Sequence, residues 1–216
     1  MAAPASAQLG PYLLLEGAST SINLDDVEAN LDSECSQVES LDWSCSYGTR
    51  DSSFGYAFGL GVNLDFLLGG EHGLRVELAQ FNLGEYEWWI AANDQSSDQN
   101  IDDEFTVSME GTGVHGIYAM PLSERLEANL TLGMLNWDVA SQRELTHRDG
   151  GTVLSENSTK QSATGTSPYF GAAVAVRMGE RVSLRGGFRV FTDVGDKKKT
   201  GQGDVSFLSA GLLFHF

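Results

Sequence analysis

The longest regular pattern in the sequence is an alternation of large apolar and small residues over thirteen positions, from Phe54 to Phe66. One parity carries the large side chains, which are Phe54, Tyr56, Phe58, Leu60, Val62, Leu64 and Phe66. The other parity carries Gly55, Ala57, Gly59, Gly61, Asn63 and Asp65. A period of two predicts a β-strand longer than an ordinary half-buried one. A glycine and alanine face suits a crowded barrel interior, and a large face that is aromatic at both ends is typical of contact with lipid.

The same alternation recurs, more or less clearly, in seven further segments, so the chain is predicted to form eight strands. These segments are 12–19, 74–86, 105–120, 125–134, 169–178, 182–191 and 207–216. In every clear segment the charged residues lie on the face opposite the apolar one.

The connections between these segments alternate between short and long. Short ones lie near 67–73, 121–124 and 179–181, and long polar ones near 21–52, 93–103, 143–166 and 196–204. An even strand number with this alternation is typical of a bacterial outer-membrane barrel. A soluble eight-stranded barrel such as a lipocalin lines its cavity with apolar residues, whereas here the inward face carries the charge. We therefore predict an all-β fold, a closed eight-stranded antiparallel transmembrane β-barrel with short periplasmic turns, long extracellular loops and both termini at the periplasmic rim.

Asp149, Gly150 and Gly151 form a strong two-residue hairpin signal inside the third long stretch. Folding the chain about Gly150 places Arg125 opposite Ala175, near the other end of both arms. The matching arms predict that the fifth and sixth strands extend beyond the membrane as one protruding hairpin.

Composition limits the function classes. The chain has 30 acids against 13 bases, a net charge of −17, so it lacks the basic stripe that a nucleic-acid binder needs. It contains no run of eighteen apolar residues and therefore no predicted transmembrane helix, although barrel strands of about ten alternating residues escape that criterion. The histidines, cysteines and acids have no metal-ligand spacing, and we expect no metal and no cofactor.

The first residues contain Ala5, Ser6 and Ala7, which match an A-x-A cleavage pattern without the charged and apolar regions that precede it in a full signal peptide. Residues 1–7 are interpreted as the remnant of a signal peptide or as a disordered N-terminus, and residues 8–216 as the barrel domain. Cys35 and Cys45 are the only two cysteines. In an oxidising compartment they are predicted to close a disulfide loop that stabilises the fold by about 2–3 kcal/mol.

The last third of the sequence resembles the N-terminal transmembrane barrel of outer membrane protein A and its small barrel relatives. The residues that carry the resemblance are Ser167–Gly171, Val182–Arg185, Val194–Asp196, Phe207–Leu212 and the final Phe216. The middle of the chain is similar at Pro121–Glu124, Leu126, Leu132–Met134 and Trp137. The resemblance covers most of residues 10–216 and implies localisation in the bacterial outer membrane.

Members of this family hold salt-bridged acids and bases inside the barrel. The resemblance assigns such a lumen network here to Glu16, Glu77 and Arg185. An acid that the family pattern places on the sixth strand falls on Ala175, so we expect the network to be rearranged. The candidates to complete it are Glu127, Arg177 and Arg189. A lumen plugged in this way conducts ions poorly.

The resemblance also implies two features of the C-terminus. The terminal Phe216, with Phe214 and other alternate apolar positions before it, is similar to the signal that the barrel-insertion machinery recognises in this family. The chain stops there, so we expect the periplasmic peptidoglycan-binding domain of full-length members to be absent.

The predicted loops carry three weaker signals. The stretch Ser21–Ser52 holds eight acids and one arginine, which is interpreted as a solvated surface, with divalent-cation binding as the alternative. Trp88 and Trp89 are predicted to belong to an aromatic belt at the membrane interface, and a contact for a partner is the alternative. Polar candidates for a lipid-modifying enzyme lie on the protruding hairpin, namely Ser141, His147, Asp149 and Ser155, but their spacing fixes no catalytic site.

We therefore predict a non-enzymatic outer-membrane barrel that presents acidic extracellular loops for envelope integrity, adhesion or docking of another surface protein. Its expected partners are outer-membrane lipid and lipopolysaccharide, the insertion machinery during assembly and a surface protein. The alternatives are a narrow diffusion pore for small solutes or ions and, less favoured, a lipid-modifying enzyme.

Overall fold

The computed structural model describes residues 10–23, 25–64, 72–94 and 96–216. The barrel strands are β1 (Pro11–Ile22), β3 (Ser52–Asn63), β4 (Gly73–Asp94), β5 (Gln99–Pro121), β6 (Leu126–Asp149), β7 (Thr152–Arg177), β8 (Val182–Asp196) and β9 (Gly201–His215). A helix, α1 (Asp25–Glu39), and a further strand, β2 (Trp43–Arg50), lie between β1 and β3. The interpretation of residues 1–7 and most of the predicted turn near 67–73 lie outside the described residues.

Eight of these strands form a closed ring, as predicted. The order of neighbours is β4-β3-β1-β9-β8-β7-β6-β5, and a further pairing of β4 with β5 closes it. All of the pairings are antiparallel, and the first and last strands meet from Tyr12 opposite His215 to Ile22 opposite Val205. In the barrel, each backbone polar group therefore has a neighbouring strand to bond with, which lipid requires.

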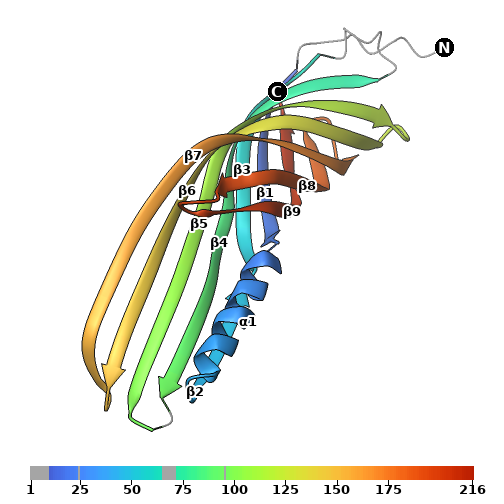
Figure 1. The fold of residues 1–216 in the computed structure, drawn as a ribbon. Helices are drawn as coiled ribbons and strands as arrows, with labels where there is room; N and C mark the ends of the chain where they lie inside the picture. The colour runs from blue at the N-terminus through green and yellow to red at the C-terminus, as the bar shows by residue number, and fades with distance from the viewer. Residues whose placement is uncertain (1–9, 24, 65–71, 95) are drawn as a thin grey trace, which may run out of the picture.

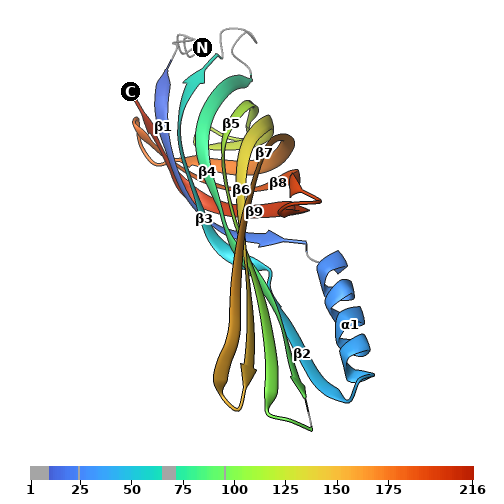
Figure 2. The same ribbon diagram turned by 60° about the vertical axis from the view of Figure 1, so that its left-hand side comes forward.

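Four of the strands continue far beyond the ring. β4 to β7 contain 22 to 26 residues, whereas β1, β3, β8 and β9 contain 12 to 15. The excess lengths form a curved open sheet, here called the extension, on the side away from the termini (Figures 1 and 2). The β6–β7 hairpin turns at Gly150 and Gly151 as predicted, but Ala175 pairs with Glu127 rather than with Arg125. The protrusion is also wider than predicted, because β4 and β5 share it.

The segment predicted as one long polar loop instead contains α1 and β2. β2 adds to the outer half of β4, with Trp43 opposite Asp94 and Arg50 opposite Glu87. The helix lies along this edge of the extension, as Figure 2 shows. It turns one face towards the sheet, because Val27, Leu31 and Cys35 recur every four residues and the last two are buried. No helix in the described part of the chain is long and apolar enough to span a membrane.

The disulfide Cys35–Cys45 joins α1 to β2, with the two Cα atoms 5.3 Å apart. Two side-chain hydrogen bonds support the same contact: Thr49 Oγ1 donates to Glu28 over 2.9 Å and Tyr47 Oη to Asp32 over 3.5 Å. The predicted disulfide is present, and it holds a helix against a strand.

Burial alternates along the barrel strands with the period that the sequence shows. On β1 the even positions from Tyr12 to Ile22 are buried, and the odd ones are exposed or half-buried. The exposed parities of the ring carry a band of large apolar side chains, which includes Leu15, Phe58, Leu60, Leu78, Val114, Leu132, Phe170, Leu184 and Leu208. Exposed side chains of this kind around a closed ring are what lipid contact requires.

Replacing Leu132 tests where this band lies. Leu132→Arg puts a charge on the outer face of β6, where the side chain is 71% exposed, and should lower the free energy of unfolding by about 2–4 kcal/mol in lipid vesicles. Ala140→Arg is the matched control, because it lies on the same strand and face but in the extension, opposite Ser108 and Ser162, and it should change stability by less than about 0.5 kcal/mol. Urea titration followed by tryptophan fluorescence measures both variants. Equal losses would place Leu132 outside the lipid.

Candidate functional site

Arg185 is the centre of the lumen. It lies on β8, is 1% exposed and contacts carboxylates from two other strands. Its Nε donates to Glu16 Oε1 over 2.8 Å, and its Nη1 and Nη2 donate to the two oxygens of Glu77 over 2.6 and 3.1 Å. Val182, Leu184, Phe188 and Val190 occupy the other parity of β8, so the alternation of the strand directs Arg185 inward.

Arg189 lies four residues further along β8, towards the extension, and shares Glu16 with Arg185. Its Nη1 donates to Glu16 Oε2 over 2.6 Å and its Nη2 to Oε1 over 3.2 Å. Its guanidinium carbon also lies 5.8 Å from the ring centres of both Phe81 and Phe207. The second arginine is therefore paired on one side and held by two aromatic faces on the other.

Two further side chains contact Glu77, and a third supports one of them. Tyr12 Oη donates to Glu77 Oε1 over 2.6 Å, and His115 Nε2 lies 2.6 Å from Glu77 Oε2. Tyr169 Oη lies 2.5 Å from His115 Nδ1. A neutral imidazole satisfies both contacts, donating from Nε2 and accepting at Nδ1. The two arginines then balance the two glutamates, which a buried charged cluster requires.

Sequence reasoning did not assign Tyr12, His115 and Tyr169 to this network. The signal that could have found them is the alternation of the strands. Tyr12 lies on the same face of β1 as Glu16, and Tyr169 on the same face of β7 as Ala175. His115 is the register partner of Glu77. Small residues make room for them. A Cβ at Gly61 would lie 2.2 Å from Tyr12 Cζ, and one at Gly133 would lie 2.6 Å from Tyr169 Cζ.

Two of the predicted members lie elsewhere. Glu127 pairs with Arg75 at the end of the barrel near the termini, in two hydrogen bonds of 2.5 and 2.7 Å, and does not contact Arg185. Arg177 is exposed and belongs to none of the ion pairs among the described residues. The prediction that Arg177 completes the buried network is therefore wrong. Among the described residues the lumen therefore holds two separate ion clusters, one central and one at the rim.

Trp88 is not part of a membrane belt. A bulge between Asn82 and Gly84, where Gly84 has a φ of 101°, inserts one residue into β4 and reverses the parity of the strand beyond it. Trp88 therefore points inward and stacks on Phe105 with ring centres 4.4 Å apart. Trp89 points outward and is 39% exposed, but Glu85 and Glu87 lie on the same face between it and the barrel.

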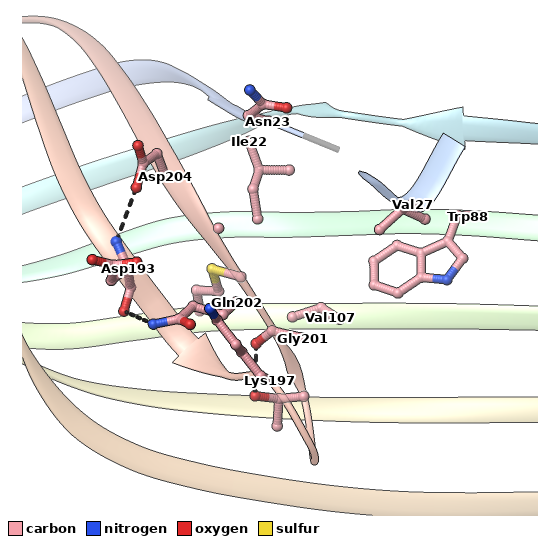
Figure 3. A pocket seen from close by; sticks show the side chains of 13 residues that line it. Ile22, Asn23, Val27, Trp88, Val107, Asp193, Lys197, Gly201, Gln202 and Asp204 are labelled. Atoms are coloured by element: carbon pink, nitrogen blue, oxygen red, sulfur yellow. Dashed lines mark hydrogen bonds between the residues drawn. The ribbon is translucent and has the colours of Figure 1, made fainter. Parts of the chain in front are cut away.

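An apolar layer and a pocket lie above the ion cluster. Phe81, Tyr169, Phe191 and Phe207 form edge-to-face and tilted contacts across the lumen. Beyond them a pocket of about 360 Å³ lies between α1, β4, β5 and the β8–β9 hairpin (Figure 3). The hairpin side of the pocket is braced by hydrogen bonds from the Asp193 amide to Asp204 and from Gln202 to the Asp193 carbonyl.

The charged residues of the extension include two ion pairs between β5 and β6. Arg143 donates to both oxygens of Asp103, and this carboxylate raises the pKa of the guanidinium. Arg148 bonds Asp102. His147 and Ser155 are register partners, but no hydrogen bond within the described residues joins them to Ser141 or Asp149, and Ser141 donates to the Lys199 carbonyl instead. No group of three potential metal ligands occurs in the described part of the chain.

A closed eight-stranded ring with an apolar exterior and a charged, filled lumen defines a small β-barrel of the bacterial outer membrane. The profile of the OmpA-like transmembrane domain matches residues 77–216, and the chain belongs to this family. This confirms the resemblance and the predicted location.

Three solved structures illustrate the likeness. Neisserial surface protein A is 12% identical, with a TM-score of 0.47, and the match covers 95% of this chain and 97% of that one. Ail, the attachment invasion locus protein of Yersinia pestis, is 12% identical with a TM-score of 0.44, covering 97% and 100%. The N-terminal barrel of Pseudomonas aeruginosa OprF is 12% identical with a TM-score of 0.38, over the same shares. A search of curated proteins finds no match.

Removing Arg185 tests the central ion cluster. Arg185→Ala leaves Glu16 and Glu77 buried with one arginine between them, so the free energy of unfolding should fall by about 3–5 kcal/mol. Arg148→Ala removes an ion pair whose side chains are 41% and 38% exposed and should cost less than about 1 kcal/mol. The midpoint of the heat-induced mobility shift on a gel compares the two. Similar losses would contradict the separation of a buried cluster from a solvent-screened pair.

The disulfide generates a second prediction. Unreduced protein should bind no thiol reagent, and replacing both cysteines by serine should destabilise the α1–β2 unit by about 2–3 kcal/mol, because the loop is then unconstrained in the unfolded state. Limited proteolysis should cut the variant between α1 and β2 first and leave the barrel intact. Labelling of both cysteines in unreduced wild-type protein would contradict a closed bond.

Proposed function

We propose that the chain is a non-enzymatic anchor in the outer membrane that holds the extension outside the cell for adhesion, envelope integrity or docking of another surface protein. The proposal is supported by the division of the molecule into a closed ring and a long extension. A short ring with a filled lumen supports strands that continue for about ten further residues and carry a disulfide-bonded helix. Strands of 12 to 15 residues are enough on one side of the ring, so the further length of β4 to β7 is available for contact with a partner.

The chemistry of the extension supports a contact role. Its outer face, which continues the lipid-facing side of β4 to β7, carries more acids than bases. The acids are Glu85, Glu87, Asp102, Glu104, Glu110, Asp138, Glu144 and Glu156, and the bases, with one from β2, are Arg50, Arg148 and Lys160. Two acids are direct cross-strand partners at Glu110–Asp138 and at Glu104–Glu144. Like charges in this position lower the stability of a sheet, so their presence on this face supports a role in recognition.

The filled lumen is evidence against the alternative function, a narrow diffusion pore. A conducting path would have to cross the Arg185 cluster, the Phe81 aromatic layer and the side chains that fill the space over the lumen glycines. We expect planar bilayers containing the protein to show no stable conductance steps. Regular steps in the wild-type protein would restore the pore hypothesis.

Shortening the β6–β7 hairpin tests the proposal. Ala140 and Ser162 are direct partners, so residues 141–161 can be replaced by an Asn-Gly turn without disturbing the ring. The shortened protein should keep its heat-induced mobility shift but lose cell adhesion, resistance to detergent or crosslinks to surface partners in intact cells. Asp149→Asn, which keeps the full length, is the control. A shortened variant that matches the wild type in all three assays would refute the proposal.

A further inference from the structure

β7 has a neighbour on both sides only within the barrel. It pairs with β6 along its whole length, but it pairs with β8 only from Tyr169 to Arg177. Above that point β8 leaves β7 and its hairpin bends across the barrel mouth, as Figure 1 shows. From Thr152 to Ser167 no described strand pairs with the outer edge of β7. Alternate residues of this edge therefore present backbone N–H and C=O groups to water.

The usual protections of an exposed edge are sparse here. Natural edge strands are short or carry lysines, prolines or bulges that prevent pairing with another chain. This edge has one lysine, Lys160, a bulge near its tip beside His147, and no proline until Pro168. Thirteen consecutive residues, from Ser155 to Ser167, are regular strand with a free backbone edge. Such an edge is a template for strand addition.

The charges along the edge indicate what pairs with it. In a chain of net charge −17, residues 152–167 carry only Glu156 and Lys160, so the edge is neutral. The two side chains lie four residues apart and thus on one face of the strand. Both are exposed, and neither forms an ion pair with any described residue.

An antiparallel copy of the same edge satisfies both charges. If two copies of β7 pair about a two-fold axis at Ser158, Glu156 of each copy lies directly opposite Lys160 of the other. The contact then contains two attractive cross-strand pairs on one face. The self-complementarity required of a symmetric dimer is thus present in the sequence of this edge.

We propose that this edge of β7 binds the same edge of a second copy, with Ser158 at the two-fold axis. The strand direction reverses across such a contact, so the two barrels lie at opposite ends of the dimer and belong to facing membranes. The partner of the extension is then another copy on a neighbouring cell, and the contact is homotypic. This inference rests on the proposed function and names the partner of the same surface.

Cysteine crosslinking tests the register. The native cysteines are paired, so an added cysteine is the sole free thiol. Ser158→Cys should give a covalent dimer on mild oxidation, because opposed Cα atoms in antiparallel strands lie about 4.5–5.5 Å apart. Gln161→Cys alone should not, but mixed with Ser155→Cys it should, because these two positions oppose each other in this register. Dimer yields that are equal for Ser158→Cys and Gln161→Cys alone would overturn the proposal.

Charge exchange tests the contact between membranes. Vesicles that carry the wild-type protein should tether to one another, and Glu156→Lys should reduce tethering by about tenfold, because two attractive pairs become repulsive. The double variant Glu156→Lys with Lys160→Glu should restore it, since the opposed charges again differ. The heat-induced mobility shift on a gel confirms that each variant is folded. Tethering that is unchanged in Glu156→Lys, or not restored in the double variant, would overturn the pairing.

The same variants separate this inference from the proposed function. If the shortened hairpin abolishes adhesion while Glu156→Lys leaves it unchanged, the extension acts on a different partner and only the homotypic contact is wrong. If the shortened hairpin leaves adhesion, detergent resistance and surface crosslinks unchanged, the proposed function itself fails.

Discussion

The structure depends on one constraint, that a backbone polar group in lipid must find its partner within the protein. The ring meets this constraint through eight antiparallel pairings, one of which is the seam between the first and last strands. Outside the membrane the constraint no longer applies. β4 to β7 continue as an open sheet there, and the edge of β7 that is closed by β8 in the barrel becomes free. Backbone hydrogen bonding to a neighbouring strand is thus required on both edges of each strand in the barrel, but not in the extension.

The lumen follows from the same alternation that makes the exterior apolar. When one parity of each strand faces lipid, the other must fill a narrow space, and here it carries large and charged side chains above glycines. Arg185 cannot be exposed to lipid or left without carboxylates, so Glu16 and Glu77 fix the relation of β1, β4 and β8 around it. The cluster is therefore a structural plug, and the extension lies above it.

The ring was readable from the sequence because period-two alternation is a local signal that persists along each strand. The β6–β7 turn was readable for the same reason, since Asp149 and the two glycines after it define a tight hairpin. The disulfide followed from there being two cysteines in an exported chain. Glu16, Glu77 and Arg185, the positions that the family resemblance suggested, lie in hydrogen-bond contact with one another through Arg185.

The features that could not be predicted from the sequence depend on weak local signals or on contacts between distant residues. The helix α1 has few large apolar residues, Val27, Leu31, Cys35 and Val38, in an acidic segment, so its amphipathic signal is weak. The bulge at Gly84 reverses the parity of β4 and moved Trp88 to the inner face, an effect that alternation alone cannot anticipate. The ion pair between Arg75 on β4 and Glu127 on β6 joins residues 52 positions apart in the sequence and depends on the orientation of both side chains within the lumen.

Hydrogen exchange of the β7 amides, measured on monomeric protein in a bilayer, tests the central claim most directly. The account predicts that all amides from Tyr169 to Arg177 exchange slowly, because both edges of β7 are paired there. From Ser155 to Ser167 it predicts that slow and fast amides alternate, because only the edge towards β6 is paired. Uniform protection along the whole strand, or fast exchange within the barrel segment, would contradict a ring that is closed in the membrane and open above it.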